Sequence, residues 1–260
     1  MLIEKIKPIV LEASQLMVHS GFDVKQKGDA TNLVTSSDLA VQHFLVKRLA
    51  EILPGSGFLC EEEDLGDIRH EYVWIIDPID GTANYARGID HCCISVALAH
   101  CGEVIEGVVY SPWRNEMYWA VKGSGAYLNG SPIRVSDRPF KDGLFCTAMS
   151  TYRKEFAKYC SDIIYDIFMR SNDTRRFGSA AIELCMMAAG KLELYFEMRL
   201  QPWDYAAASL ILSEAGGVSC GFDGGPLSLS KASMTLAANN KDNLEELLST
   251  VHRYLPELPY

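Results

Sequence analysis

The stretch WIIDPIDGTANY (residues 74–85) is the most informative part of this 260-residue chain. An apolar run typical of a strand leads into Asp77 and Asp80, and the proline and glycine beside them indicate a turn. We expect this turn to expose both carboxylates where the strand ends. Two carboxylates so close in the chain repel each other unless a cation lies between them, and such hard oxygen ligands suit magnesium. The backbone N–H groups of Gly81 and Thr82 then offer a cradle for phosphate.

Asp77 and Asp80 could instead simply cap a turn, because Asp-Pro and Asp-Gly pairs do so in many proteins. The complete DPIDGT string is far rarer by chance than either pair, and it favours a functional site. Upstream, GFLCEEED (57–64) again places an apolar strand directly before carboxylates, although a charge run by itself is usually a solvated face. Downstream, QPWDYAAASLILSEAGG (201–217) predicts a helix that opens near Asp204. Its small residues indicate close packing against another element.

The hydrophobic pattern predicts a single unit over residues 1–260 with a seam near residue 142. In the first part, an α+β half over 1–142, we expect helices at 2–19 and 36–52. The same half contains β-branched and aromatic runs that predict a largely antiparallel sheet, at 72–77, 93–99, 104–110, 116–121 and 126–130. In the second part, an α/β half over 143–260, alternating elements predict another sheet with helices on its faces. We expect its strands at 144–149, 192–197 and 235–240, and its helices at 153–169, 178–189, 204–215 and 242–252.

The composition argues against several classes of partner. The chain carries 24 Lys and Arg against 34 Asp and Glu, a formal net charge of −10. This charge opposes binding to nucleic acid or to an anionic membrane surface, so we expect neither. The first residues lack the pattern of a signal peptide, and no apolar run approaches the ~20 residues of a membrane span, so we expect a cytoplasmic protein. The eight cysteines lack metal-ligand spacing, which predicts reduced and mostly buried thiols.

Over nearly its whole length the chain resembles the inositol monophosphatase family, within the wider group that includes fructose-1,6-bisphosphatase and the nucleotide bisphosphate phosphatases. The resemblance is carried by NLVTSSD (32–38), Glu61-Glu62, DPIDGT (77–82), GSAA (178–181), Glu197 and Trp203-Asp204. It implies an α+β fold arranged as a five-layer αβαβα sandwich. It also implies a requirement for Mg²⁺, with two or three ions, inhibition by lithium, and a homodimer.

By position, the resemblance assigns metal binding to Glu61, Asp77, Asp80, Asp204 and the backbone carbonyl of Ile79. It assigns substrate binding to Asp80, Gly81, Thr82, Ala180 and Glu197, and catalysis to Thr82, Glu61 and Asp38. A water held between Glu61 and Asp77 would attack phosphorus in this scheme. The Thr82 hydroxyl, supported by Asp38, would orient or deprotonate that water. Lys27, in the loop before Asn32, would balance charge there, unless it is an exposed structural lysine.

The expected reaction is release of phosphate from a small phosphorylated polyol, above all inositol monophosphate. Glu197 would accept hydrogen bonds from the hydroxyls of that leaving group, although without the resemblance it is equally a solvated glutamate at a strand end. Arg199 stands where a small residue is usual and leaves the substrate open, so a fructose-1,6-bisphosphatase or histidinol-phosphate phosphatase is the alternative. A metal-dependent binding or regulatory protein without turnover is the non-enzymatic alternative, against which the retained acidic ligands and Thr82 argue.

Overall fold

The computed structural model describes residues 1–19, 24–26, 33–63, 69–149 and 153–255. Lys27 and Asn32 lie outside these residues. Among the residues described, no helix is long and apolar enough to cross a membrane. All eight cysteines fall within the described part of the chain and carry reduced thiols, seven of them buried and one, Cys101, exposed. The expectation of reduced, mostly buried cysteines is therefore confirmed.

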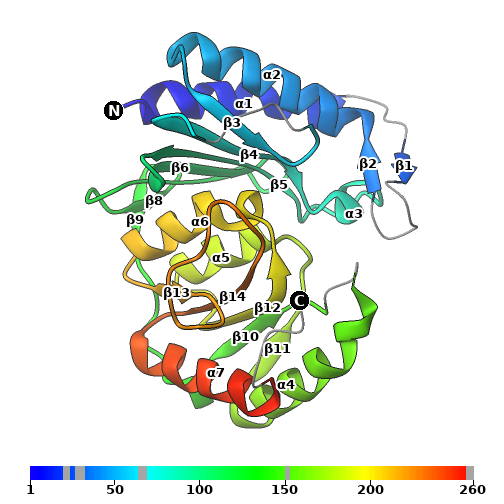
Figure 1. The fold of residues 1–260 in the computed structure, drawn as a ribbon, viewed down its shortest axis with the longest axis vertical. Helices are drawn as coiled ribbons and strands as arrows, with labels where there is room; N and C mark the ends of the chain where they lie inside the picture. The colour runs from blue at the N-terminus through cyan, green and yellow to red at the C-terminus, as the bar shows by residue number, and fades with distance from the viewer. Residues whose placement is uncertain (20–23, 27–32, 64–68, 150–152, 256–260) are drawn as a thin grey trace.

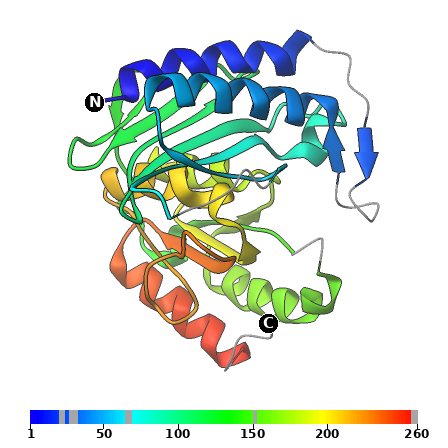
Figure 2. The same ribbon diagram turned by 45° about the horizontal axis from the view of Figure 1, so that its top comes forward.

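The first helical layer consists of α1 (Ile3–His19) and α2 (Ser36–Ile52), which cover one face of the larger sheet (Figure 1). Figure 2 shows the two helices side by side across that sheet. Apolar side chains at helical spacing on α1, such as Ile6 and Ile9, are buried in one cluster with Trp74 of the sheet. The amphipathic pattern in the sequence thus predicted both helices correctly.

The larger sheet has seven strands in the order β3-β4-β5-β6-β7-β8-β9. β3 pairs parallel with β4, and each later pair of neighbours is antiparallel, as the sequence predicted for most of this region. The strands are β3 (Gly57–Cys60), β4 (Tyr72–Asp80), β5 (Cys93–His100), β6 (Glu103–Ser111), β7 (Glu116–Val121), β8 (Ala126–Leu128) and β9 (Ser131–Ile133).

The middle helical layer, α5 (Ala180–Ala188) and α6 (Pro202–Glu214), lies between the two sheets (Figure 1). Its alanines allow the close approach that the sequence predicted: Ala206, Ala207 and Ala208 are completely buried. At Gly107 of β6, an added Cβ would lie only 3.0 Å from the carbonyl oxygen of Ala207. Small residues on both elements therefore bring α6 directly onto the larger sheet.

The smaller sheet has five strands in the order β11-β10-β12-β14-β13, and its outer face carries the last helical layer. The strands are β10 (Leu144–Thr147), β11 (Asp173–Arg175), β12 (Leu194–Leu200), β13 (Val218–Cys220) and β14 (Ser233–Ala238). The outer helices are α4 (Ala157–Arg170) and α7 (Lys241–Tyr254). β10 pairs parallel with both β11 and β12, whereas β14 is antiparallel to both of its neighbours.

The layers follow one another as helices, sheet, helices, sheet, helices, so the fold is the α+β, five-layer αβαβα sandwich expected from the resemblance (Figure 1). The remaining described elements are short: β1 (Val24–Gln26), β2 (Leu33–Thr35), α3 (Thr82–Tyr85), η1 (Phe140–Asp142) and η2 (Lys154–Phe156). β11 and β13 had no separate signal in the sequence, because three residues are too few to display a period.

Candidate active site

The two aspartates of the DPID string lie inside a strand, and the expected exposed turn is wrong. β4 continues through Asp80, with Asp77 only 1% and Asp80 only 8% exposed. Its pairing with β5 shifts between Asp77, opposite Ser95, and Asp80, opposite Cys93. Three steps along β4 therefore match two along β5, which is a β-bulge. The bulge accommodates the proline between the aspartates, which cannot donate to a regular ladder.

Asp80 is held by residues that follow the smaller sheet's β11. Its Oδ2 accepts hydrogen bonds from the Ser179 hydroxyl and from the backbone N–H of Ala181, each at 2.7 Å. Burial raises the pKa of Asp80 to about 6, although these hydrogen bonds favour its charged form. The same segment contains Ala180, which is 7% exposed at the first position of α5. The structure thus places Ala180 beside Asp80, as a shared pocket requires.

Asp204 lies in the first turn of α6, where the sequence predicted a helix start. Its Oδ2 accepts the backbone N–H of Gln201 at 2.7 Å in a capping box, and Pro202 occupies the first helical turn. Burial raises the pKa of Asp204, and the negative charges of Asp80 and Glu61 raise it further. A helix cap thus fixes a carboxylate that faces the carboxylates of the larger sheet.

Asp77 interacts electrostatically with the other three expected ligands, so that Glu61, Asp77, Asp80 and Asp204 form one carboxylate group. Burial raises its pKa well above the ordinary value, and the charges of Glu61, Asp80 and Asp204 act in the same direction. Glu61 follows β3, and its backbone N–H donates to the carbonyl of Ile76 on β4 at 3.2 Å. The structure therefore brings all four expected carboxylate ligands into one electrostatic environment.

This donor set fits a hard divalent cation. The four side chains offer only carboxylate oxygens, and the residues that shift the pKa of Asp77 most are acidic. Asp80 and Asp204 each use Oδ2 to accept a hydrogen bond from the protein. Each carboxylate has a second oxygen, which would bind the cation. Within the described residues, no three His, Cys, Asp or Glu side chains form a ready-made coordination group. The fit to a hard cation therefore rests on the chemistry of the donors, which are oxygen ligands that share negative charge.

Thr82 lies at the start of α3, directly after Gly81 in the left-handed region at φ 90°. Its hydroxyl donates to the carbonyl of Ile79 at 3.1 Å and lies 3.4 Å from Oδ1 of Asp38, a buried residue of α2. The structure thus brings together Thr82, Asp38 and the Ile79 carbonyl, which the resemblance had placed in one site. Gly81 is required here because an added Cβ would lie 3.0 Å from the His91 carbonyl oxygen.

Glu197 lies within β12 and does not end it, contrary to the predicted strand at 192–197. The strand continues to Leu200, and its pairing with β14 shifts between these two residues. Burial raises the pKa of Glu197 to about 8, while a hydrogen bond of 2.7 Å from the Tyr195 hydroxyl favours the charged form. The negative charges of Glu183 and Asp80 raise the pKa, and the positive charge of Arg176 lowers it. Glu197 is therefore near enough to the carboxylate group to sense Asp80.

Three contributors escaped the sequence reasoning. Ser179 stood in the GSAA segment but had no assigned role, Tyr195 is a fully buried aromatic, and Asn84 belonged to the decisive stretch without a function. Contacts made across the fold identify Ser179 and Asn84, whereas Tyr195 is identified by its hydrogen bond to Glu197 two residues along the same strand. Arg199 is partly buried and lies two residues after Glu197 on β12. It is therefore close to the glutamate expected to contact the substrate, as its expected effect on substrate choice requires.

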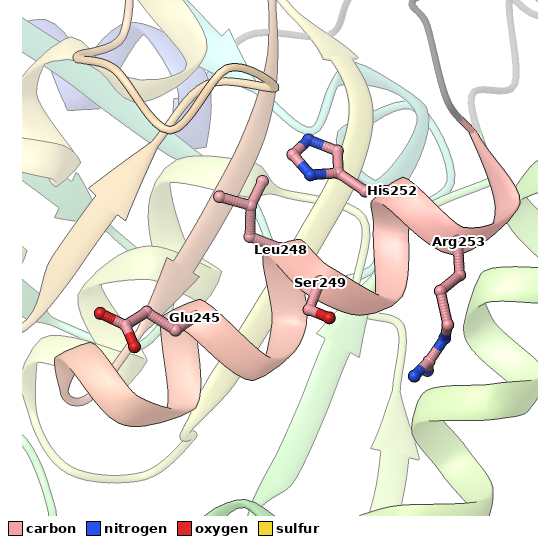
Figure 3. A pocket seen from close by; sticks show the side chains of 5 residues that line it. All are labelled: Glu245, Leu248, Ser249, His252 and Arg253. Carbon is pink, nitrogen blue, oxygen red and sulfur yellow. The ribbon is translucent and has the colours of Figure 1, made fainter.

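A shallow hollow on the outer helical layer has a different character. Figure 3 shows its lining on one face of α7: Glu245, Leu248, Ser249, His252 and Arg253. His252 Nε2 is hydrogen-bonded to the carbonyl of Phe222 at 2.7 Å. This mixed surface is separated from the acidic residues by the smaller sheet, so the carboxylate group between the sheets is the candidate active site.

The comparisons with known proteins agree with this geometry. The sequence model of the inositol monophosphatase family matches residues 2–255. Inositol-1-monophosphatase of Bacillus subtilis is 33% identical over 237 residues, 89% of either chain. Nus factor SuhB of Xylella fastidiosa is 39% identical over 188 residues, 72% of this chain and 68% of that protein. The crystal structure of extragenic suppressor protein suhB from Bartonella henselae superposes with a TM-score of 0.90 at 28% identity, covering 98% of this chain and 100% of that one.

The fold and the site define a class of metal-dependent phosphatases. The chain belongs to the inositol monophosphatase family.

Proposed function

We propose that this protein is a Mg²⁺-dependent phosphomonoesterase that releases phosphate from a small phosphorylated polyol, with inositol monophosphate as the preferred substrate. The observation that carries the proposal is the group of four carboxylates in which burial and neighbouring acids raise the pKa of Asp77. The name of the Bacillus subtilis relative supports inositol monophosphate in particular. Two or three Mg²⁺ ions, the number expected for the family, would be held by Glu61, Asp77, Asp80, Asp204 and the Ile79 carbonyl.

The chain's own groups account for the steps that follow. Bound magnesium supplies the positive charge that lowers the pKa of a water and stabilises the leaving oxygen. Thr82 orients the attacking water through its hydroxyl, and Asp38 Oδ1, 3.4 Å away, accepts a hydrogen bond or proton from that hydroxyl. The backbone at Gly81 and Thr82 faces the phosphate. Positioning and charge stabilisation suffice for this reaction, because phosphoryl transfer needs little covalent help from the protein.

Glu197 supports a polyol leaving group. Its carboxyl group receives one hydrogen bond from Tyr195, and the remaining acceptor capacity suits vicinal hydroxyls. Ala180, whose backbone lies within hydrogen-bond reach of Asp80, has a small side chain that would suit packing against a ring. A second anionic group on the substrate would meet Arg176, whose charge acts on Glu197, or the neighbouring Arg199. A bisphosphate substrate such as fructose 1,6-bisphosphate therefore remains the alternative within the same reaction.

A phosphate-release panel tests the proposal. The substrates are inositol monophosphate, fructose 1,6-bisphosphate, histidinol phosphate and adenosine bisphosphate, each with Mg²⁺ and after chelation, and with lithium added to the active combinations. We expect the highest kcat/KM for inositol monophosphate, with inhibition by lithium. A higher value for another substrate would reassign the specificity, and no release from any substrate would reject the activity.

A second candidate is a role of the Nus-factor kind, favoured by the Nus factor SuhB relatives that this chain matches. Such a role is compatible with the phosphatase site, since the two names occur within one family. The substrate panel tests only the phosphatase role, and absence of phosphate release by the intact protein would favour the second role alone. The homodimer and the cytoplasmic location also stay predictions, and light scattering of the purified protein measures the first.

A further inference from the structure

Asn84 joins the two sheet regions next to the candidate active site. Its side-chain Nδ2 donates to the backbone carbonyl of His91 at 2.8 Å and to that of Phe177 at 2.7 Å. The carbonyl of Gly178 lies 3.4 Å from the same nitrogen. His91 precedes β5 of the larger sheet, whereas Phe177 and Gly178 follow β11 of the smaller one. One amide therefore uses its two N–H groups to bridge segments that are 86 residues apart in the chain, from residue 91 to residue 177.

The surroundings of this bridge are closely fitted. The rings of His91 and Phe177 stack with centroids 4.9 Å apart. A Cβ added at Gly178 would lie 3.3 Å from Asn84 Nδ2, and one added at Gly81 would lie 3.1 Å from the Gly178 carbonyl oxygen. Glycines at positive φ on both sides of the joint thus allow the two backbones to approach Asn84.

The bridge leads directly to a carboxylate of the site. Glu183 accepts the backbone N–H groups of Phe177 and Gly178 at 2.9 and 2.7 Å, so this short segment is held from both ends. The next residue, Ser179, donates to Asp80 Oδ2 at 2.7 Å. Asn84 lies four residues after Asp80 on the other side of the joint. A continuous series of contacts thus connects the Asn84 bridge to the donor that holds Asp80.

We propose that Asn84 is a positioning residue: by clamping the 177–178 segment against the larger sheet, it sets the orientation in which Asp80 meets magnesium and substrate. This inference rests on the proposed function. It assigns Asn84 no contact with the reacting atoms. Asn84 thus has a different role from the aspartates of the same DPIDGTAN string, because its two N–H groups donate to backbone carbonyls.

The substitution Asn84→Asp tests the proposal because it keeps the size of the side chain and replaces both donors by a carboxylate. That carboxylate would face three carbonyl oxygens, which repel it. We expect the Mg²⁺ concentration for half-maximal activity to rise about tenfold or more, with a smaller loss of kcat at saturating Mg²⁺. The loss should be equal for inositol monophosphate and for p-nitrophenyl phosphate, because Asp80 serves both reactions.

Asn129→Asp is the matched control. Asn129 lies at the β8–β9 hairpin, and its Nδ2 also donates to a backbone carbonyl, that of Asn115, at 2.8 Å. We expect this variant to lose some thermal stability and to keep the wild-type Mg²⁺ requirement. If Asn84→Asp likewise lowers only Tm, with the Mg²⁺ requirement unchanged, Asn84 is a structural residue and the proposal is overturned.

Two further measurements keep the result unambiguous. Should Asn84→Asp fail to fold, Asn84→Ser removes the bridge without adding charge and receives the same assay. In a cycle with Ser179→Ala, the effects of Asn84→Asp and Ser179→Ala should combine to less than their sum, and strict additivity would overturn the route through Ser179. Mg²⁺-dependent thermal stabilisation gives a readout independent of turnover. If Mg²⁺ stabilises the wild type but the wild type releases no phosphate, the proposed function fails, and the thermal titration still decides the role of Asn84. If the wild type shows neither response, both proposals are overturned.

Discussion

The strands β4 and β12 make the same departure from regular pairing, and the proposed function gives their carboxylates different roles. In β4 the pairing with β5 gains one residue between Asp77 and Asp80, and in β12 the pairing with β14 gains one between Glu197 and Leu200. A bulge turns side chains away from the regular alternation of a strand. Both strands therefore place their carboxylates where a regular ladder would not, and Asp80 lies near enough to Glu197 to raise its pKa.

The surroundings of the two bulges differ in charge. Next to the β4 bulge, Asp77 is surrounded by acidic residues that raise its pKa, so a cation is the natural partner. At the β12 bulge, burial and the negative charges of Glu183 and Asp80 also raise the pKa of Glu197, but a hydroxyl donor from Tyr195 and the positive charge of Arg176 act in the opposite direction. We therefore expect the environment to decide the role of each bulged carboxylate, metal binding for those of β4 and recognition of hydroxyl groups for Glu197.

The β4 side of the comparison is tested most strongly by removing the metal. The proposed function needs Mg²⁺ to activate the attacking water and to stabilise the leaving oxygen. Exhaustive chelation should therefore abolish phosphate release, and added Mg²⁺ should restore it. The measurement is the initial rate of phosphate release before chelation, after it and after addition of Mg²⁺. Full turnover in the chelated protein would show that this carboxylate group serves another purpose.

Asp80→Asn should give the next largest effect. The substitution removes one negative charge from the metal ligands, and we expect kcat to fall on the order of a hundredfold or more. The fold should survive, since an asparagine carbonyl can still accept the donors from Ser179 and Ala181. Asp142→Asn, at an exposed position, is the matched control and should keep the wild-type kcat. A kcat near that of wild type at saturating Mg²⁺ would reduce Asp80 to a structural residue of the bulge.

Glu197→Gln addresses the β12 side and should have a smaller, selective effect. Glu197 is charged above its pKa of about 8. A hydrogen bond to a charged group contributes roughly 1.5–3 kcal/mol, so kcat/KM for inositol monophosphate, assayed above that pH, should fall about ten- to hundredfold. The value for p-nitrophenyl phosphate, which has no hydroxyl groups to contact, should change much less. Equal losses on both substrates would mean that Glu197 supports the metal site or the fold. Arg199→Gly, assayed on the same pair and on fructose 1,6-bisphosphate, shows whether the arginine selects a second phosphate.

The comparison also shows how far the sequence alone could lead. The carboxylates of β4 were found because their string is contiguous, and Asp204 because a helix start leaves a local signal. The bulges were missed, since register depends on a partner strand that local patterns do not specify. Ser179 meets Asp80 across 99 residues, and Asn84 meets Phe177 across 93. Such contacts exist only once the sheets have packed, so these two residues showed no local signal of their role.

Glu183→Gln should keep the metal ligands of the β4 bulge and change how stability depends on pH. Glu183 is 1% exposed, and burial raises its pKa from 4.5 to about 7 while its backbone partners favour the charged form. The folded state therefore binds this proton more tightly than the unfolded state, so the contribution of Glu183 is fully present below pH ~4.5 and is lost as the pH rises towards about 7.

Glutamine cannot ionise, and its carbonyl oxygen can still accept the N–H groups of Phe177 and Gly178. At pH 8 the Glu183→Gln variant should therefore gain on the order of 3 kcal/mol over the wild type, relative to the difference between them at pH 4.5. Urea unfolding at both pH values in the presence of a chelator measures this, because bound Mg²⁺ would mask the carboxylate repulsion. Exposed Glu245→Gln is the control and should track the wild type. If the two variants show the same pH dependence, the Glu183 carboxyl is not kept neutral by burial, and its hold on the 177–178 segment is that of a charged acceptor.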